Sequence, residues 1–160
     1  MSSKRFKKLP TDTKKMKSDI IEKLIPLVKK NCTTKFDESV DLSFQINNKQ
    51  KKNEINIRTV VNLPGGSGKK VKVAVVCEES KSNDAKSGQA EIRNDKDGNI
   101  GVSIGKKSFA DDKLIKNYNA IIETLEKEKS NNTVKGELVK SAFVTSTMGV
   151  SYKLKIGKSI

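Results

Sequence analysis

The stretch VDLSFQI (residues 40–46) alternates apolar and polar residues without a break. Successive side chains of a β-strand point to opposite faces, so this pattern predicts a strand with one buried face and one exposed face. The four apolar residues form the buried face, and Asp41, Ser43 and Gln45 form the other. The fold then depends on which segments pair with this strand and which cover its apolar face.

Other segments of the chain share the strand pattern. They are predicted at residues 57–63, 70–77, 90–94, 99–105, 137–146 and 152–156. The sequence DKDG (residues 95–98) is typical of a hairpin turn between two of them. We therefore expect consecutive strands to pair in antiparallel fashion.

Two segments have helical periodicity instead. In the first, the apolar stripe consists of Ile20, Ile21, Leu24, Leu27 and Val28. Ser18 or Asp19 is the candidate N-cap of this helix, and Pro26 is expected to kink or divide it because proline removes one helical hydrogen bond.

The second helix is predicted over residues 110–129. Ser108 and Asp111 have the spacing of a capping box at its start. Its apolar stripe consists of Leu114, Tyr118, Ile121, Ile122 and Leu125. Two helices over a mainly antiparallel sheet predict an α+β fold, a two-layer sandwich.

The net charge indicates the class of partner. The chain has 160 residues, with 33 Lys and Arg against 19 Asp and Glu, for a formal net charge of +14. This length suits a single domain, predicted over residues 19–160, preceded by a basic N-terminal arm at residues 1–18. A charge of about 2–8 already keeps a small domain soluble, so the larger excess favours binding to a polyanion.

Counting excludes several kinds of chemistry. The chain contains no histidine, which rules out a histidine-based triad, and its two cysteines, Cys32 and Cys77, match no metal-binding spacing. We expect two buried, reduced thiols, no metal, no cofactor and no enzymatic activity. No apolar stretch approaches the ~20 residues of a membrane span, so we expect a soluble, cytoplasmic protein that does not bind a membrane.

The stretch LPGGSGKK (residues 63–70) resembles a phosphate-binding loop only superficially. The P-loop pattern requires glycine at position 63, where the chain has Leu63, and serine or threonine at position 70, where it has Lys70. The stretch also leads into a predicted strand, whereas a P-loop leads into a helix. It is better interpreted as a hairpin loop whose glycines supply positive φ.

Four longer motifs identify a family resemblance. They are KFDESVDLSF, IRTVVNLPGGSGKKVKVAVVC, EIRNDKDGNIGVSIGKKSF and KSAFVTSTMG. In this order they resemble ribosomal protein L1, over about residues 32–156. Members of that family carry a second α/β domain inserted after the position of Cys77. The resemblance implies that this domain is absent here and that residues 78–88 replace it; the sequence leaves open whether the absence is natural or engineered.

The resemblance also implies a function. L1 proteins bind 23S ribosomal RNA at the L1 stalk of the large subunit, near the tRNA exit site. Many bacterial members also repress translation of their own mRNA. We therefore expect this chain to bind 23S rRNA and its own mRNA, to lie close to exit-site tRNA in the ribosome, and to be a monomer outside it. The alternative from charge alone is a basic domain that binds any polyanion without a defined site.

The family's recognition patch carries over onto two motifs. The corresponding residues are Lys35, Phe36, Ser39, Ser146, Thr147, Met148 and Gly149. Hydroxyl and backbone groups can bind the 2′-hydroxyls and phosphates of the shallow groove of RNA, and a glycine permits close approach. From the residues alone, Phe36 and Met148 would more readily be core residues. Ser39 keeps the hydroxyl of the family's threonine and loses its methyl group.

Basic residues outside the two motifs are expected to add electrostatic attraction. The candidates are Arg58, Lys69, Arg93, Lys106 and Lys140. Each is equally compatible with an ordinary solvated surface charge. Two departures from the family lie nearby: the loop at residues 47–56 is longer than its counterpart, and Gly101 replaces a common histidine.

Overall fold

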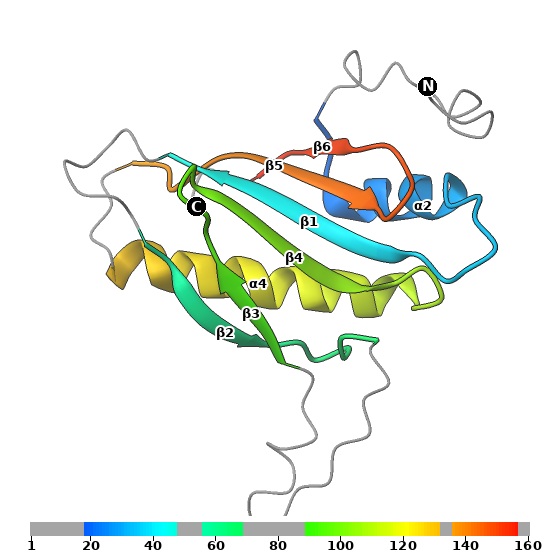
Figure 1. Cartoon of the computed structure of the whole chain (residues 1–160), viewed down its shortest axis with the longest axis horizontal. Helices are drawn as coiled ribbons and strands as arrows, with labels where there is room; N and C mark the ends of the chain where they lie inside the picture. Colours follow the sequence, from blue (N-terminus) through cyan, green and yellow to red (C-terminus); the bar gives the residue numbers. More distant parts are fainter. Residues whose placement is uncertain (1–17, 48–55, 69–88, 132–135, 157–160) are drawn as a thin grey trace, which may run out of the picture.

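The computed structural model describes residues 18–47, 56–68, 89–131 and 136–156 (Figure 1). In chain order the elements are α2 (Ile21–Lys30), β1 (Ser39–Ile46), β2 (Arg58–Asn62), β3 (Gln89–Arg93), β4 (Asn99–Lys106), α4 (Asp111–Asn131), β5 (Val139–Ser146) and β6 (Tyr152–Leu154). The predicted basic arm (apart from residue 18), the strand at 70–77 and the junction at 78–88 lie outside the described residues.

The strand VDLSFQI becomes the inner strand β1 of a four-stranded antiparallel sheet with the order β4-β1-β5-β6. Its register places Leu42 opposite Val102 of β4 on one side and opposite Val144 of β5 on the other. The prediction that consecutive strands pair is therefore wrong for β1, whose two partners are distant in sequence. Periodicity specifies which face a strand buries and carries no information about its neighbours.

The DKDG turn forms as predicted, but the two strands it joins diverge. The Gly98 N–H donates to the Asp95 carbonyl at 3.1 Å, and Gly98 has a φ of 79°. Hydrogen bonds from Asn99 lower the pKa of the Asp95 carboxyl. Next to the turn, a single bridge joins Asn94 to Ile100. Strand β3 itself pairs with β2 and not with β4, and the two form a separate two-stranded ribbon beside α4 (Figure 1).

Helix α2 covers the part of the sheet formed by β5 and β6. Its buried residues are Ile21, Leu24, Ile25 and Val28, whereas Ile20 and Leu27 of the predicted stripe are exposed. The N-cap is Ile20, which makes no side-chain capping bond, so the predicted cap at Ser18 or Asp19 is wrong. Pro26 lies inside the helix and does not divide it.

Helix α4 lies in the same layer as α2 and packs against β4 and the β2–β3 ribbon. The Ala110 carbonyl accepts the first i+4 bond, from the N–H of Leu114. Ser108 does not cap the helix as predicted, because its N–H and hydroxyl both donate to Asp37. Of the predicted stripe, Leu114, Ile121 and Leu125 are buried, and Tyr118 and Ile122 are partly buried.

Both helices thus cover one face of the sheet, which confirms the two-layer α+β sandwich (Figure 1). Between the layers lie the apolar residues of β1 together with those of β4, β5 and the helices. Burying this aliphatic surface is the main stabilising contribution. No helix in the described part of the chain is long and apolar enough to cross a membrane.

Candidate nucleic-acid interface

The two predicted segments, residues 35–39 and 146–149, lie side by side at one end of the sheet, where β1 begins and β5 ends (Figure 1). We call these residues the end patch. Thr147 joins its halves, since its Oγ1 accepts the Ser39 N–H at 3.0 Å and its N–H donates to the Ser39 carbonyl at 3.1 Å. The juxtaposition follows from the antiparallel pairing of β1 with β5.

Five residues of the end patch are exposed: Lys35, Phe36, Asp37, Thr147 and Met148. Phe36 is 53% exposed and Met148 is 48% exposed, so interpreting these two as core residues is wrong. Both are large apolar groups that solvent reaches, and they flank the polar junction of the two segments. Such groups can pack against ribose or base faces.

Ser146 and Gly149 lie beneath the exposed residues. Ser146 is 3% exposed, and its hydroxyl has no hydrogen-bond partner among the described residues. A Cβ atom on residue 149 would lie 2.3 Å from the Ser146 Oγ, which is closer than any real contact. A side chain at position 149 would therefore force the Ser146 hydroxyl to rotate away, so glycine suits the packing of the loop over Ser146 as well as a close approach of RNA.

Glu38 is a buried charged residue within the end patch, and its burial was not predicted. Its Oε1 accepts the Thr34 hydroxyl at 2.7 Å, and its Oε2 accepts the Met148 N–H at 3.1 Å. Burial by itself raises the pKa of Glu38, but the hydrogen bonds from Thr34 and Met148 outweigh it and the pKa lies below its usual value. The Ser146 hydroxyl adds to this lowering, although its geometry falls short of a hydrogen bond.

Of the predicted electrostatic residues, Lys106 joins the end patch. Its Nζ donates to the Ser39 Oγ at 2.9 Å. Arg58, Arg93 and Lys140 lie away from the end patch. Arg58 and Arg93 are paired in the β2–β3 ribbon, and Lys140 precedes Ser141, which pairs with Gln45 at the opposite end of β1. At ~3.3 Å per residue, Gln45 is about 20 Å along β1 from Ser39. Lys69 lies outside the described residues.

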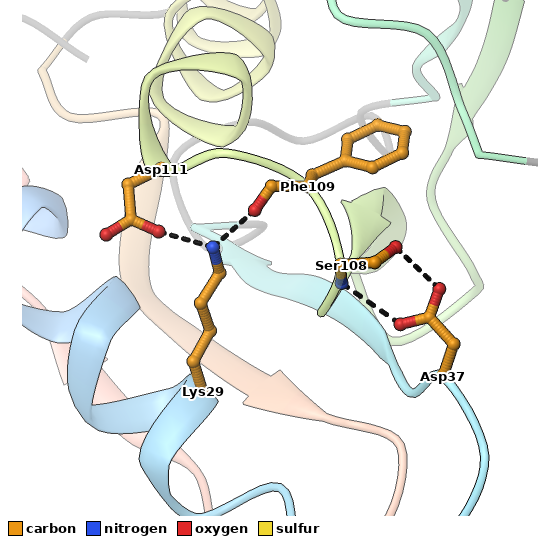
Figure 2. Close-up of polar contacts among 5 residues, drawn as sticks. All are labelled: Lys29, Asp37, Ser108, Phe109 and Asp111. Atoms are coloured by element: carbon orange, nitrogen blue, oxygen red, sulfur yellow. Dashed lines mark hydrogen bonds and ion pairs between the residues drawn. The ribbon is translucent and has the colours of Figure 1, made fainter.

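Asp37 and Lys29 each make two polar contacts with the segment between β4 and α4 (Figure 2). Asp37 accepts the Ser108 N–H at 3.0 Å and the Ser108 hydroxyl at 2.7 Å. Lys29, from the last turn of α2, bonds to the Phe109 carbonyl and the Asp111 carboxylate at the start of α4. The segment preceding β1 is thus fixed to the start of α4, and α2 is fixed to α4.

The open face of the sheet, opposite the helices, adjoins the end patch. The half of this face that lies away from the end patch contains a hollow of about 590 Å³. The lining includes Ser43, Gln45, Asn99, Gly101, Ser141 and Phe143. Phe143 is the large apolar side chain exposed on this face, 36% accessible, and a Cβ on Gly101 would meet open space. Small and polar residues therefore surround one accessible aromatic ring.

The described residues contain no group of three or more His, Cys, Asp or Glu side chains arranged to hold a metal ion. Cys32 is a free, buried thiol, as predicted, and burial raises its pKa, which makes it a poor nucleophile. Cys77 lies outside the described residues. The end patch offers hydroxyls, backbone groups, one lysine near Ser39 and exposed apolar surface. These groups bind ligands and do not suggest bond-making chemistry.

Comparison with known proteins finds the same family by sequence profile and by individual relatives. The sequence profile described as "Ribosomal protein L1p/L10e family" matches residues 28–87 and 80–150. The large ribosomal subunit protein uL1 of Pelagibacter ubique is 52% identical over 229 residues, covering 100% of this chain and 100% of that protein. The uL1 proteins of Mycoplasma capricolum and Deinococcus radiodurans are each 28% identical, over 222 and 224 residues, covering 96% of this chain and 98% and 96% of theirs.

Proposed function

The chain belongs to the ribosomal protein L1p/L10e family, and we propose that it is a constituent of the large ribosomal subunit that binds 23S rRNA through the end patch. The single observation that carries the proposal is the pairing of Ser39 with Thr147, which unites the family's two motifs in one exposed surface. Members of this family are structural proteins, which agrees with the expectation that the chain is not an enzyme.

The surface suits RNA for three physical reasons. Exposed hydroxyl and backbone groups match the 2′-hydroxyls of the shallow groove, which distinguish RNA from DNA. Phe36 and Met148 add apolar contact at the same place. Lys106 and the net charge of +14 attract the phosphates without selecting a sequence. We expect the bound RNA to continue from the end patch onto the open face beside Phe143.

The finer assignment rests on the family resemblance. We infer that the RNA is the base of the L1 stalk near the tRNA exit site, which places the chain on the ribosome in the cytoplasm. A similar shape in its own mRNA would allow the protein to repress its own translation. Exit-site tRNA would then be a neighbour within the ribosome.

We also propose that residues 78–88 replace an inserted second domain. The family profile matches the chain in two stretches that meet at residues 80–87. In addition, the alignment with the Pelagibacter ubique protein spans 229 residues, more than the 160 residues of this chain. An alignment longer than the chain is expected if the relative carries an internal segment that this chain lacks. The described elements form a sheet and helix layer with its own core, consistent with a single domain.

The proposed function is tested by measuring binding to two RNAs. We expect the chain to bind a stalk-base fragment of Pelagibacter ubique 23S rRNA at least about a hundredfold more tightly than a scrambled fragment of equal length, as specific sites exceed non-specific ones. Filter binding at two salt concentrations should show a similar salt dependence for both RNAs, since phosphate contacts supply it. Equal affinity for both would contradict the proposal and favour a domain that binds any polyanion.

A further inference from the structure

Glu38 is buried without an ionic partner. Its side chain is 0% exposed, and no salt bridge of the described residues involves it. Charged side chains are almost never fully buried unless they are paired or hydrogen-bonded, because leaving water is costly for an ion. A carboxylate in this position therefore requires donors that compensate for the lost solvent.

Those donors come from separate parts of the chain. Thr34, in the loop after α2, supplies its hydroxyl and its N–H to Oε1 at 2.7 and 3.4 Å. Met148, in the exposed loop after β5, supplies its N–H to Oε2 at 3.1 Å. The Glu38 carbonyl in turn accepts the Lys107 N–H at 2.8 Å, at the end of β4. One residue thus connects three segments that meet at the end patch.

We propose that Glu38 is the positioning residue of the RNA-binding surface: its carboxylate fixes the backbone of Met148, and with it residues 147–149, against residues 34–39. Glu38 itself is buried and does not contact RNA. The proposal deepens the proposed function and rests on it for the effect on RNA affinity, whereas the effect on the Met148 backbone holds for the protein alone.

The chemistry requires a carboxylate and not merely a polar group. Both oxygens of Glu38 accept bonds, and the donors on opposite sides include the N–H of Thr34 and the N–H of Met148. Glutamine has one oxygen and one NH₂, so its NH₂ must face one of these donors. A Glu38→Gln variant therefore keeps the size of the side chain and loses the negative charge together with one of these two backbone bonds.

The ionised form is the one that dominates at neutral pH. The ionisable groups near Glu38 include Lys107, Asp37 and Cys32. Lys107 is oriented toward the Cys32 carbonyl at 2.7 Å, and Asp37 toward Ser108. Hydrogen bonding lowers the pKa of Glu38 below its usual value. The carboxylate therefore holds Met148 at any pH above the usual value, and this contribution is lost only as the pH falls through the lowered pKa.

The experiment compares Glu38→Gln with Glu123→Gln, a matched control that removes the same charge from an exposed position on α4. We expect Glu38→Gln to weaken binding to the stalk-base fragment by roughly tenfold, the effect of one lost hydrogen bond to a charged group. Scrambled RNA should bind both variants equally. In combination with Thr147→Val, the losses should be less than multiplicative, because both changes release the same loop. Unchanged affinity in a folded Glu38→Gln variant would overturn the proposal.

A second measurement uses the unmodified protein and covers the case in which the variant fails to fold. In NMR spectra recorded between pH 7 and pH 3, the Met148 amide resonance should titrate together with the Glu38 carboxyl, with a midpoint below the usual glutamate value of about 4.3. If the chemical shift of the Met148 amide stays unchanged while Glu38 titrates, the proposal is overturned. If the unmodified protein does not prefer the stalk-base fragment but the Met148 amide does titrate, the proposed function fails and the positioning role stands.

Discussion

A Thr147→Val variant is expected to bind the stalk-base RNA at least about fivefold more weakly than the unmodified protein, with unchanged affinity for scrambled RNA. Valine has nearly the shape of threonine but lacks the hydroxyl. Thr147 Oγ1 accepts the Ser39 N–H at 3.0 Å, so the variant removes one of the side-chain bonds between the two halves of the end patch. It also removes an exposed hydroxyl that can bind a 2′-hydroxyl of RNA. Loss of one such group from a specific site changes affinity by about 1–3 kcal/mol.

Thr124→Val provides the matched control for this change. Thr124 lies on α4, where its hydroxyl donates to the Ala120 carbonyl at 2.8 Å. It is about 20 Å along the helix from Asp111, the end of α4 that Lys29 contacts. Affinity of this control for both RNAs should stay within about twofold, the ordinary effect of a surface substitution. Equal losses for Thr147→Val on stalk-base and scrambled RNA would indicate that binding depends on charge alone.

The largest expected effect on stability comes from Asn117→Ala. Asn117 is fully buried on α4 and fastens the loop after β2 to the sheet. Its Oδ1 accepts the Gly65 N–H at 2.7 Å, and its Nδ2 donates to the Ile104 and Gly66 carbonyls at 2.7 and 3.0 Å. Alanine leaves these backbone groups without partners, at about 1–3 kcal/mol for each that stays buried, so we expect the free energy of unfolding to fall by at least about 2 kcal/mol.

Urea denaturation followed by circular dichroism measures this loss. Asn119→Ala is the control, because Asn119 lies two positions further along the same helix and is exposed. The control should change the free energy of unfolding by no more than about 0.5 kcal/mol. An Asn117→Ala variant as stable as the control would show that water or neighbouring groups replace the amide.

The layers of the fold could be predicted from the sequence because periodicity reports burial. The alternation in β1 and the stripe of Leu114, Ile121 and Leu125 both correspond to buried faces. Strand order could not be predicted in the same way. Strands β4 and β5 have the same length as β1, and only long-range packing decides that both flank it. Periodicity also misplaced Leu27, since the sheet covers a narrower stripe of α2 than the sequence pattern suggests.

The two segments of the site could be predicted from the sequence, but the contacts that hold them together could not. Family motifs identified the two segments of the end patch, and strand pairing brings them together. Glu38 could not be found this way, because an isolated glutamate between polar residues looks solvent-exposed and its donors, Thr34 and Met148, come from different segments. Ser108 likewise bonds with Asp37, far away in sequence, in place of the local cap that its spacing suggested. Polar contacts between residues distant in sequence produce no periodic pattern from which they could be predicted.

Mapping the bound RNA on the protein surface tests the end patch most directly. Amide chemical shifts of the ¹⁵N-labelled chain should be recorded while the stalk-base fragment is added, with the scrambled fragment as reference. We predict the largest stalk-specific changes at residues 35–39 and 146–149, with smaller ones on the open face around Phe143. If the largest changes instead appear on the exposed sides of α2 and α4, the RNA binds the opposite layer and the end patch is not the site.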